Sequence, residues 1–247
     1  DGFVYKIDTI TNSRLWESPR FIGTDENDGV LALYAGRSEL VFLADKTNVD
    51  TDIFLDKLSS VDGKDLKDFD EISISSLDED FGTSVTFDGS DSFIYALVDS
   101  NYSLSDGSPT SSFSRDINLL SYTAEGATSE IQTIRTSEDD FSVVIKNITN
   151  TDVAVIGGYT EGELEGNTKK GVTGTDAFIS TFISTEANST TLLQFGTEGD
   201  DKVIDIEPVS ENKFLVLWSE DHTGENGATT YRVSAFSSEG EMLSEEP

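Results

Sequence analysis

Apolar residues in this chain either alternate with polar ones or form short runs, and Gly, Asn, Asp and Ser bound both kinds of segment. These patterns are typical of β-strands, and no window sustains the 3.6-residue period of a long helix. The pattern predicts strands at residues 3–8, 14–22, 30–35, 39–45, 53–58, 69–75, 84–88, 93–99, 117–123, 130–136, 142–147, 153–160, 177–184, 190–195, 203–208, 213–219, 231–237 and 241–246. We therefore expect an all-β fold.

An acidic corner between two strands occurs four times. Its last acids are Asp28, Asp80, Asp140 and Asp201, which lie 52, 60 and 61 residues apart. Self-similarity at such a period indicates an array of supersecondary units. Each period contains four predicted strands, one of which opens with Asp, as in Asp176-Ala177-Phe178.

A four-stranded unit of this size cannot bury both of its faces alone, so neighbouring units must stack. Radial stacking of such sheets gives a β-propeller. We therefore predict a β-propeller-like array of four-stranded antiparallel blades. The rival all-β interpretation, a pair of sandwiches, predicts no such fixed repeat.

We expect one propeller-like body spanning 1–247. Its approximate repeat units are 1–48, 49–113, 114–174 and 175–227, followed by a partial unit at 228–247. Eighteen strands make four quartets and a spare hairpin, and an unpaired hairpin exposes a sheet edge. We therefore expect an incomplete or partner-completed ring, whose edge is completed by a flanking segment or by a second chain.

The segment 153–206 resembles the bacterial β-propeller repeat known as SBBP. The resemblance rests on Gly157-Gly158-Tyr159-Thr160, Asp176-Ala177-Phe178, and Gly196-Thr197 with Asp200-Asp201. Elsewhere the chain departs from the pattern at Asn118, Arg135 and Thr230. The resemblance implies a propeller-like module of a large secreted or surface bacterial protein, and it brings no catalytic residues with it.

The net charge of −32 and the pI near 4.1 limit the partners that the chain can bind. Nucleic acid and anionic lipid need clusters of Lys and Arg, which the 16 basic residues do not form. No apolar run is long enough for membrane insertion. With 36% hydrophobic residues the chain is apolar enough to fold, and we expect salt or divalent cations to screen its self-repulsion.

The acidic corners are candidate sites for a hard cation, and calcium is the one cofactor that they suggest. Ca²⁺ takes six to eight oxygen ligands, which closely spaced Asp residues and backbone carbonyls can supply. The spacing is not that of an EF-hand. The alternative, which we favour, is that these Asp side chains accept backbone N–H groups and hold the turns. The candidate residues are Asp25, Asp28, Asp78, Asp80, Asp139, Asp140, Asp200 and Asp201.

Catalytic patterns are weak in this sequence. A Ser-His-Asp triad would depend on His222, the single histidine, which lies in a turn-like segment. Pairs of carboxylates, which glycoside cleavage requires, are weak evidence for an enzyme in a chain that contains 48 acidic residues. We expect Trp16 and Trp218 to pack in the core rather than to form sugar-binding platforms. The sequence therefore predicts no enzyme.

We predict a non-enzymatic adhesion or interaction module of a large bacterial protein, located outside the cell or at its surface. Long polar loops at 100–115, 161–175 and 220–229 would meet a protein or glycan partner. Two alternatives remain open: a calcium-stabilised structural spacer, and a non-catalytic domain attached to a secreted hydrolase.

Overall fold

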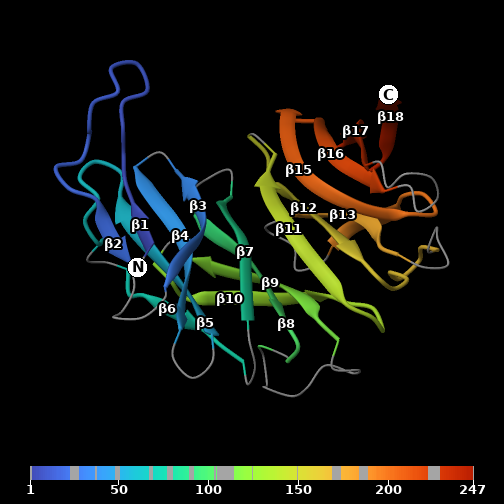
Figure 1. The fold of residues 1–247 in the computed structure, drawn as a ribbon, viewed down its shortest axis with the longest axis horizontal. Helices are drawn as coiled ribbons and strands as arrows, with labels where there is room; N and C mark the ends of the chain where they lie inside the picture. The colour runs from blue at the N-terminus through green and yellow to red at the C-terminus, as the bar shows by residue number, and fades with distance from the viewer. Residues whose placement is uncertain are drawn as a thin grey trace.

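The computed structural model contains only β-strands and their connections (Figure 1). It describes residues 2–22, 28–36, 38–47, 51–66, 69–76, 80–88, 92–102, 104, 114–123, 125–148, 150–168, 174–183, 189–221 and 229–246. These residues form no helix that could span a bilayer. The predicted all-β class is confirmed.

Four antiparallel four-stranded sheets follow one another along the chain, and each is built from four consecutive strands. Blade 1 contains β3 (Gly29–Ala35), β4 (Glu39–Thr47), β5 (Thr51–Ser59) and β6 (Ile72–Ile74). Blade 2 contains β7 (Asp80–Phe87), β8 (Phe93–Ser100), β9 (Asp116–Thr123) and β10 (Thr128–Ile134). Blade 3 contains β11 (Asp140–Asn147), β12 (Val153–Thr160), β13 (Asp176–Ile183) and β14 (Ser189–Phe195). Blade 4 contains β15 (Asp200–Ser210), β16 (Lys213–Asp221), β17 (Thr229–Ser237) and β18 (Met242–Glu246).

The first strands of the blades lie next to one another, β3 against β7, β7 against β11 and β11 against β15. Each first strand carries a register shift at the same place opposite the second strand, at Leu31, Thr83, Val143 and Ile204. A bulge bends a strand and increases its twist. The shared position shows that the blades repeat one local geometry.

The hydrophobic core consists of layers between successive sheets, because alternate side chains of a strand point to opposite faces. On β12, Ala154 and Ile156 pack toward blade 2, whereas Val155 packs toward blade 4. Gly157 leaves room for Val203 and Ile206 of blade 4, since a Cβ at Gly157 would lie 2.7 Å from the Val203 side chain. Each blade therefore depends on its neighbours for burial of its apolar residues.

A two-stranded sheet precedes blade 1, formed by β1 (Gly2–Val4) and β2 (Arg20–Ile22). Val4 and Ile22 pack with Phe42 and Phe54 of blade 1. The connection between β1 and β2 projects from the body as the blue loop of Figure 1. The described sheets form a propeller-like array that does not close into a ring.

Each predicted strand overlaps a strand of the structure, but those predicted at 3–8, 14–22 and 69–75 are shorter than expected. Beyond Val4 only one bridge, Ile7 to Arg14, joins the two arms of the connection. The sheets are also offset by two strands from the repeat units read from the sequence, because the Asp-initiated strand is the third strand of a blade. A repeat unit therefore joins the outer half of one blade to the inner half of the next.

Candidate binding cleft at the acidic corners

In the three corners whose turns the structure describes, the last Asp accepts hydrogen bonds from the residue four positions before it. The Thr136 amide donates to Asp140 Oδ2 at 2.6 Å, and the Thr197 amide donates to Asp201 Oδ2 at 2.6 Å. Asp80 accepts from the Ser76 amide at 2.7 Å and from the Ser76 hydroxyl at 2.9 Å. These three carboxylates are buried. The hydrogen bonds are those of a turn-forming Asp.

The preceding Asp of the corner joins two blades. The amide of Arg115, which precedes the third strand of blade 2, donates to Asp139 Oδ1 at 2.8 Å, and the Asp140 amide returns a bond to the Arg115 carbonyl at 2.7 Å. The next junction repeats this reciprocal pair, with 3.0 Å from Thr175 N to Asp200 Oδ1 and 2.7 Å from Asp201 N to Thr175 O. We call each such pair a clasp. The paired acids thus connect consecutive blades.

Gly174 makes the second clasp possible. Its φ is +100°, which disfavours any residue with a side chain, and a Cβ there would lie 2.6 Å from Asp200 Oδ1. A side chain at position 174 would therefore displace the carboxylate that binds Thr175.

The metal-binding interpretation remains a prediction. Asp25 and Asp78 lie outside the described residues, and Asp28 is buried at the start of β3. Among the residues that the structure describes, no group of three or more His, Cys, Asp or Glu side chains is arranged to hold a metal ion. Calcium binding is therefore left to experiment.

Several carboxyl groups near the corners have raised pKa values because burial disfavours their charged forms. Burial raises the pKa of Asp99 to about 7. Hydrogen bonds from the Ser142 hydroxyl at 2.5 Å and the Ser142 amide at 3.0 Å act in the opposite direction and lower it. Burial likewise raises the pKa of Asp140 to about 7, and those of Asp116 and Asp201 to about 6. The corner region therefore takes up protons on folding near neutral pH.

A row of cationic and aromatic side chains crosses blades 2, 3 and 4 beside these carboxyls. The Arg115 guanidinium lies 4.1 Å from the centre of the Phe81 ring and 5.0 Å from that of Phe141. Phe141 stacks on Tyr159 with ring centroids 4.7 Å apart, and Lys202 Nζ lies 4.7 Å from the Tyr159 centroid. Such contacts stabilise a cation at an aromatic face. We call these five residues the cation–aromatic row.

A cleft of about 450 Å³ opens at the junction of blades 3 and 4, at the end of this row. It is lined by Glu138, Glu161, Gly174, Thr175, Asp200 and Lys202. Glu138 and Asp200 belong to two successive acidic corners, and Glu161 follows β12. Three carboxylates face one ammonium group, so the lining is negative.

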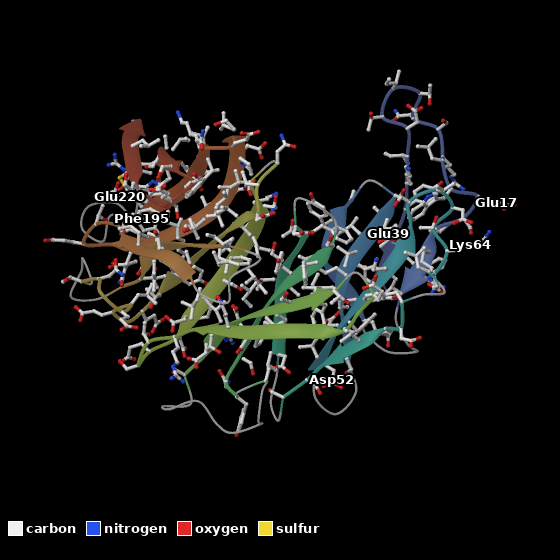
Figure 2. All side chains as sticks on the ribbon, turned by 180° about the vertical axis from the view of Figure 1, so that it is seen from behind. Glu17, Glu39, Asp52, Lys64, Phe195 and Glu220 are labelled. Atoms are coloured by element: carbon white, nitrogen blue, oxygen red, sulfur yellow. The ribbon has the colours of Figure 1, made fainter. Side chains whose placement is uncertain are left out.

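A larger cleft of about 810 Å³ lies beside β2, but four of its five charged side chains form two ion pairs. Arg20 Nη2 lies 2.7 Å from Asp65 Oδ1, and Lys64 Nζ lies 2.8 Å from Asp62 Oδ2. Glu17 and Lys64, both in its lining, lie at the hairpin end of the molecule, far from Glu220 in blade 4 (Figure 2). This mutual neutralisation makes it the weaker candidate.

Both tryptophans are core residues, as the sequence indicated. Trp16 is 2% exposed and lies beneath Gly63, whereas Trp218 is 3% exposed and donates from Nε1 to Ser234 Oγ at 3.0 Å. Phe195, labelled in Figure 2, contacts Trp218 edge to face with ring centroids 5.4 Å apart. Neither indole is available as a binding platform.

The sequence did not identify Arg115, Tyr159, Glu161 or Lys202 as site residues. Tyr159 and Lys202 lie on different blades, and only the packing of β12 against β15 brings them together. The one available signal was that Tyr159 and Glu161 flank a strand end beside a long loop. His222 and most of the loops at 100–115 and 220–229 lie outside the described residues, as does the segment 169–173 of the third long loop.

No family model matches the chain, and no curated protein is similar to it. The resemblance to SBBP-like repeats therefore stays a prediction. Among solved structures, a mutant of Synechocystis apocarotenoid oxygenase is similar with a TM-score of 0.46 and 11% identity. A chimera of this oxygenase with RPE65 is similar with a TM-score of 0.45 and 11% identity.

Each match covers 81% of this chain and 44% of the other chain, so the chain spans less than half of those proteins. These neighbours are enzymes by name, and the finding contradicts two predictions from the sequence. One is that the chain is not an enzyme. The other is that it is a non-enzymatic adhesion module, with its alternatives of a spacer or a hydrolase-attached domain. We withdraw both predictions. At 11% identity the match does not identify a reaction, so no oxygenase activity is transferred to this chain.

Proposed function

We propose that the cleft between blades 3 and 4 binds an organic cation, a molecule that carries ammonium or guanidinium groups. The observation that supports this most directly is the lining of the cleft, in which Glu138, Glu161 and Asp200 face a single ammonium group, that of Lys202. The volume of about 450 Å³ falls within the range of about 300 to 1,000 Å³ that is usual for small-molecule sites.

An extended cation fits this cleft better than a metal ion does. In the described part of the chain, acidic side chains form no cluster tight enough for a metal, whereas an extended cation can reach separate carboxylates with separate donors. The net charge of −32 raises the local concentration of cations around the whole protein. The Tyr159 ring holds the Lys202 ammonium, so the side of the cleft formed by Lys202 adjoins an aromatic face that binds a cation.

Calorimetric titration with agmatine, which carries one guanidinium and one ammonium group, tests the proposal. We expect the paired substitution Glu138→Gln and Glu161→Gln to weaken binding about fivefold, because two lost charge pairs of about 0.5 kcal/mol each amount to about 1 kcal/mol. Asp200 is left intact because it forms the clasp with Thr175.

The matched control is Glu207→Gln together with Glu211→Gln, which removes the same charge from exposed positions in blade 4. This control should leave agmatine affinity within about twofold of the unsubstituted protein, since only screened long-range attraction is lost. Equal weakening in both double variants would show nonspecific attraction and overturn the proposal, as would undetectable binding to the unsubstituted protein.

A further inference from the structure

The hairpin β1–β2 corresponds to the outer half of a blade. The Asp-initiated strands β5, β9 and β13 are the third strands of their sheets, and β1 follows the same motif, Asp1-Gly2-Phe3. β1 pairs antiparallel with β2, as a third strand pairs with a fourth, and it lies against the first strand of the following blade, β3. The hairpin therefore occupies the third and fourth positions of a sheet.

The inner edge of this sheet is open. In the complete blades the third strand pairs on both sides, as β5 pairs with β4 and β6. Among the residues that the structure describes, β2 is the only strand that pairs with β1. An open strand edge presents N–H and C=O groups to which another strand can pair.

Leu33 on β3 lies where the first and second strands of this sheet would pack. It pairs with Phe42, and the same register position holds Val85, Ile145 and Ile206 in blades 2, 3 and 4. Those three side chains are 4%, 1% and 0% exposed and pack in the layer shared with the preceding blade. Leu33 is 49% exposed, because among the described residues the sheet before blade 1 has no first or second strand to cover it.

The charge of the hairpin also differs from that of the rest of the chain. Residues 2–22 carry Lys6, Arg14 and Arg20 against Asp8 and Glu17, which gives a net charge of +1, whereas the whole chain has −32. The first and second strands of this repeat begin at an acidic corner. The hairpin therefore lacks the excess of negative charge that the rest of the chain would present to an acidic pair of strands.

We propose that the free edge of β1 binds an antiparallel β-hairpin with the pattern of the first and second strands of this repeat. In such a hairpin an acidic corner precedes the first strand. The apolar second strand pairs with β1, and the first strand covers Leu33. The docking repeats an arrangement that blades 2, 3 and 4 each make with the blade before them, so the required geometry is already present in the molecule.

The test attaches a copy of residues 136–160, which contain the corner, β11 and β12, in front of Asp1 of the full chain. The linker has the length of segment 161–175, which makes the same connection in blade 3. Because the chain has no Cys, Leu33→Cys provides a single labelling site. We expect the fused hairpin to slow thiol labelling at position 33 by about tenfold or more and to raise the Tm.

Phe3→Cys serves as the internal control for the position of the hairpin. Phe3 is 63% exposed on the face that points away from blade 1, and a hairpin paired in the plane of the sheet leaves that face open. A second fusion, with proline at the copied positions of Ile145 and Ile156, removes the strand pairing and should leave position 33 labelled as fast as in the unfused chain.

Unchanged labelling at position 33 in the first fusion overturns the proposal. Slower labelling of Phe3→Cys with no change at position 33 also overturns the proposal, since the hairpin would then stack on the face of the β1–β2 sheet that points away from blade 1. Labelling at position 33 of the unfused chain that slows as protein concentration rises would mean that a second copy covers the site, and this too counts against the proposal.

Discussion

At the scale of single residues, paired acids and a glycine determine how the blades meet. The described corner Asp residues form no metal-binding cluster, and five of them turn their carboxylates to a local amide or to the preceding blade. A charged hydrogen bond at a junction contributes more than a neutral one, provided that the amide can approach. Gly174 provides that approach at the junction of blades 3 and 4.

Gly174→Ala should therefore destabilise the protein more than Gly166→Ala does. Both glycines have positive φ, +100° and +77°, but a Cβ at Gly166 would meet no atom within 4 Å. We expect about 1 kcal/mol for Gly166→Ala from backbone strain alone and about 2 to 4 kcal/mol for Gly174→Ala. Urea unfolding measures both, and equal losses would show that the Asp200 clasp contributes nothing.

At the scale of elements, strands of different blades are joined both by apolar layers and by the cation–aromatic row. Arg115 lies between a ring of β7 and a ring of β11, so its side chain links blades 2 and 3 in addition to its backbone clasp. Lys202 of β15 makes the corresponding contact with Tyr159 of β12. The row therefore follows the order of the blades.

Arg115→Gln should lower the free energy of unfolding by about 1 to 2 kcal/mol, because two cation–π contacts of about 0.5 to 1 kcal/mol each are lost. The backbone bonds of Arg115 to the corner do not depend on its side chain. Arg135→Gln, at an exposed position, is the matched control and should change stability by less than about 0.5 kcal/mol. A double-mutant cycle with Phe141→Leu that gives no coupling energy would contradict this account.

At the scale of the whole molecule, the net negative charge and the unclosed array of sheets have the largest influence on stability. The net charge of −32 opposes compaction, and the buried carboxyls add to this opposition whenever they are ionised. Because the array does not close, apolar surface also remains at its two ends, at Phe3 and Phe21 on the hairpin and at Tyr231 on blade 4. Conditions that remove charge or cover these ends should stabilise the fold.

Stability should fall as pH rises from about 4 to about 7. Burial raises the pKa values of Asp99 and Asp140 to about 7 and of Asp56, Asp116 and Asp201 to about 6, above the ordinary value of 3.8. Across that window the folded chain binds more protons than the unfolded chain, so the free energy of unfolding decreases with increasing pH. Above about pH 8 this contribution is constant.

Urea unfolding at about pH 5 and about pH 8, each at low and high salt, measures the effect. Salt reduces the general repulsion between surface charges but leaves the desolvation of buried carboxyls largely unchanged. The pH dependence should therefore persist at high salt. A protein that is more stable at pH 8 than at pH 5 would show that the buried carboxyls are ionised in the fold.

Thermal unfolding in EDTA, and then in millimolar Ca²⁺ or Mg²⁺ at constant ionic strength, tests the calcium prediction. Specific binding to the folded state raises Tm with calcium beyond the magnesium control. Because the described carboxylates are engaged in turns and clasps, we expect equal Tm values in the two ions. A rise of several degrees specific to calcium would indicate ion binding at the corners and would lead first to substitution of Asp139 and Asp200.

The strands, their antiparallel order and the repeat followed from the sequence, because alternation and turn residues act over a few neighbouring positions. The corner Asp residues were recognisable for the same reason, since Thr136 and Asp140 lie within one turn. The shortening of the first two strands was not predictable. The 3–8 and 14–22 segments have apolar residues at strand spacing, but beyond Val4 only the Ile7 to Arg14 bridge pairs their backbones.

Local patterns in the sequence are thus sufficient to give the fold class and the positions of the corners. The contacts between side chains of different blades came only from the folded structure: Arg115 with Phe141, Tyr159 with Lys202, and the three carboxylates of the cleft. It also decided that Leu33 is exposed where its counterparts are buried. Contacts of this kind depend on the register between strands and on the stacking of separate sheets, and neither leaves a periodic mark in one segment of the chain.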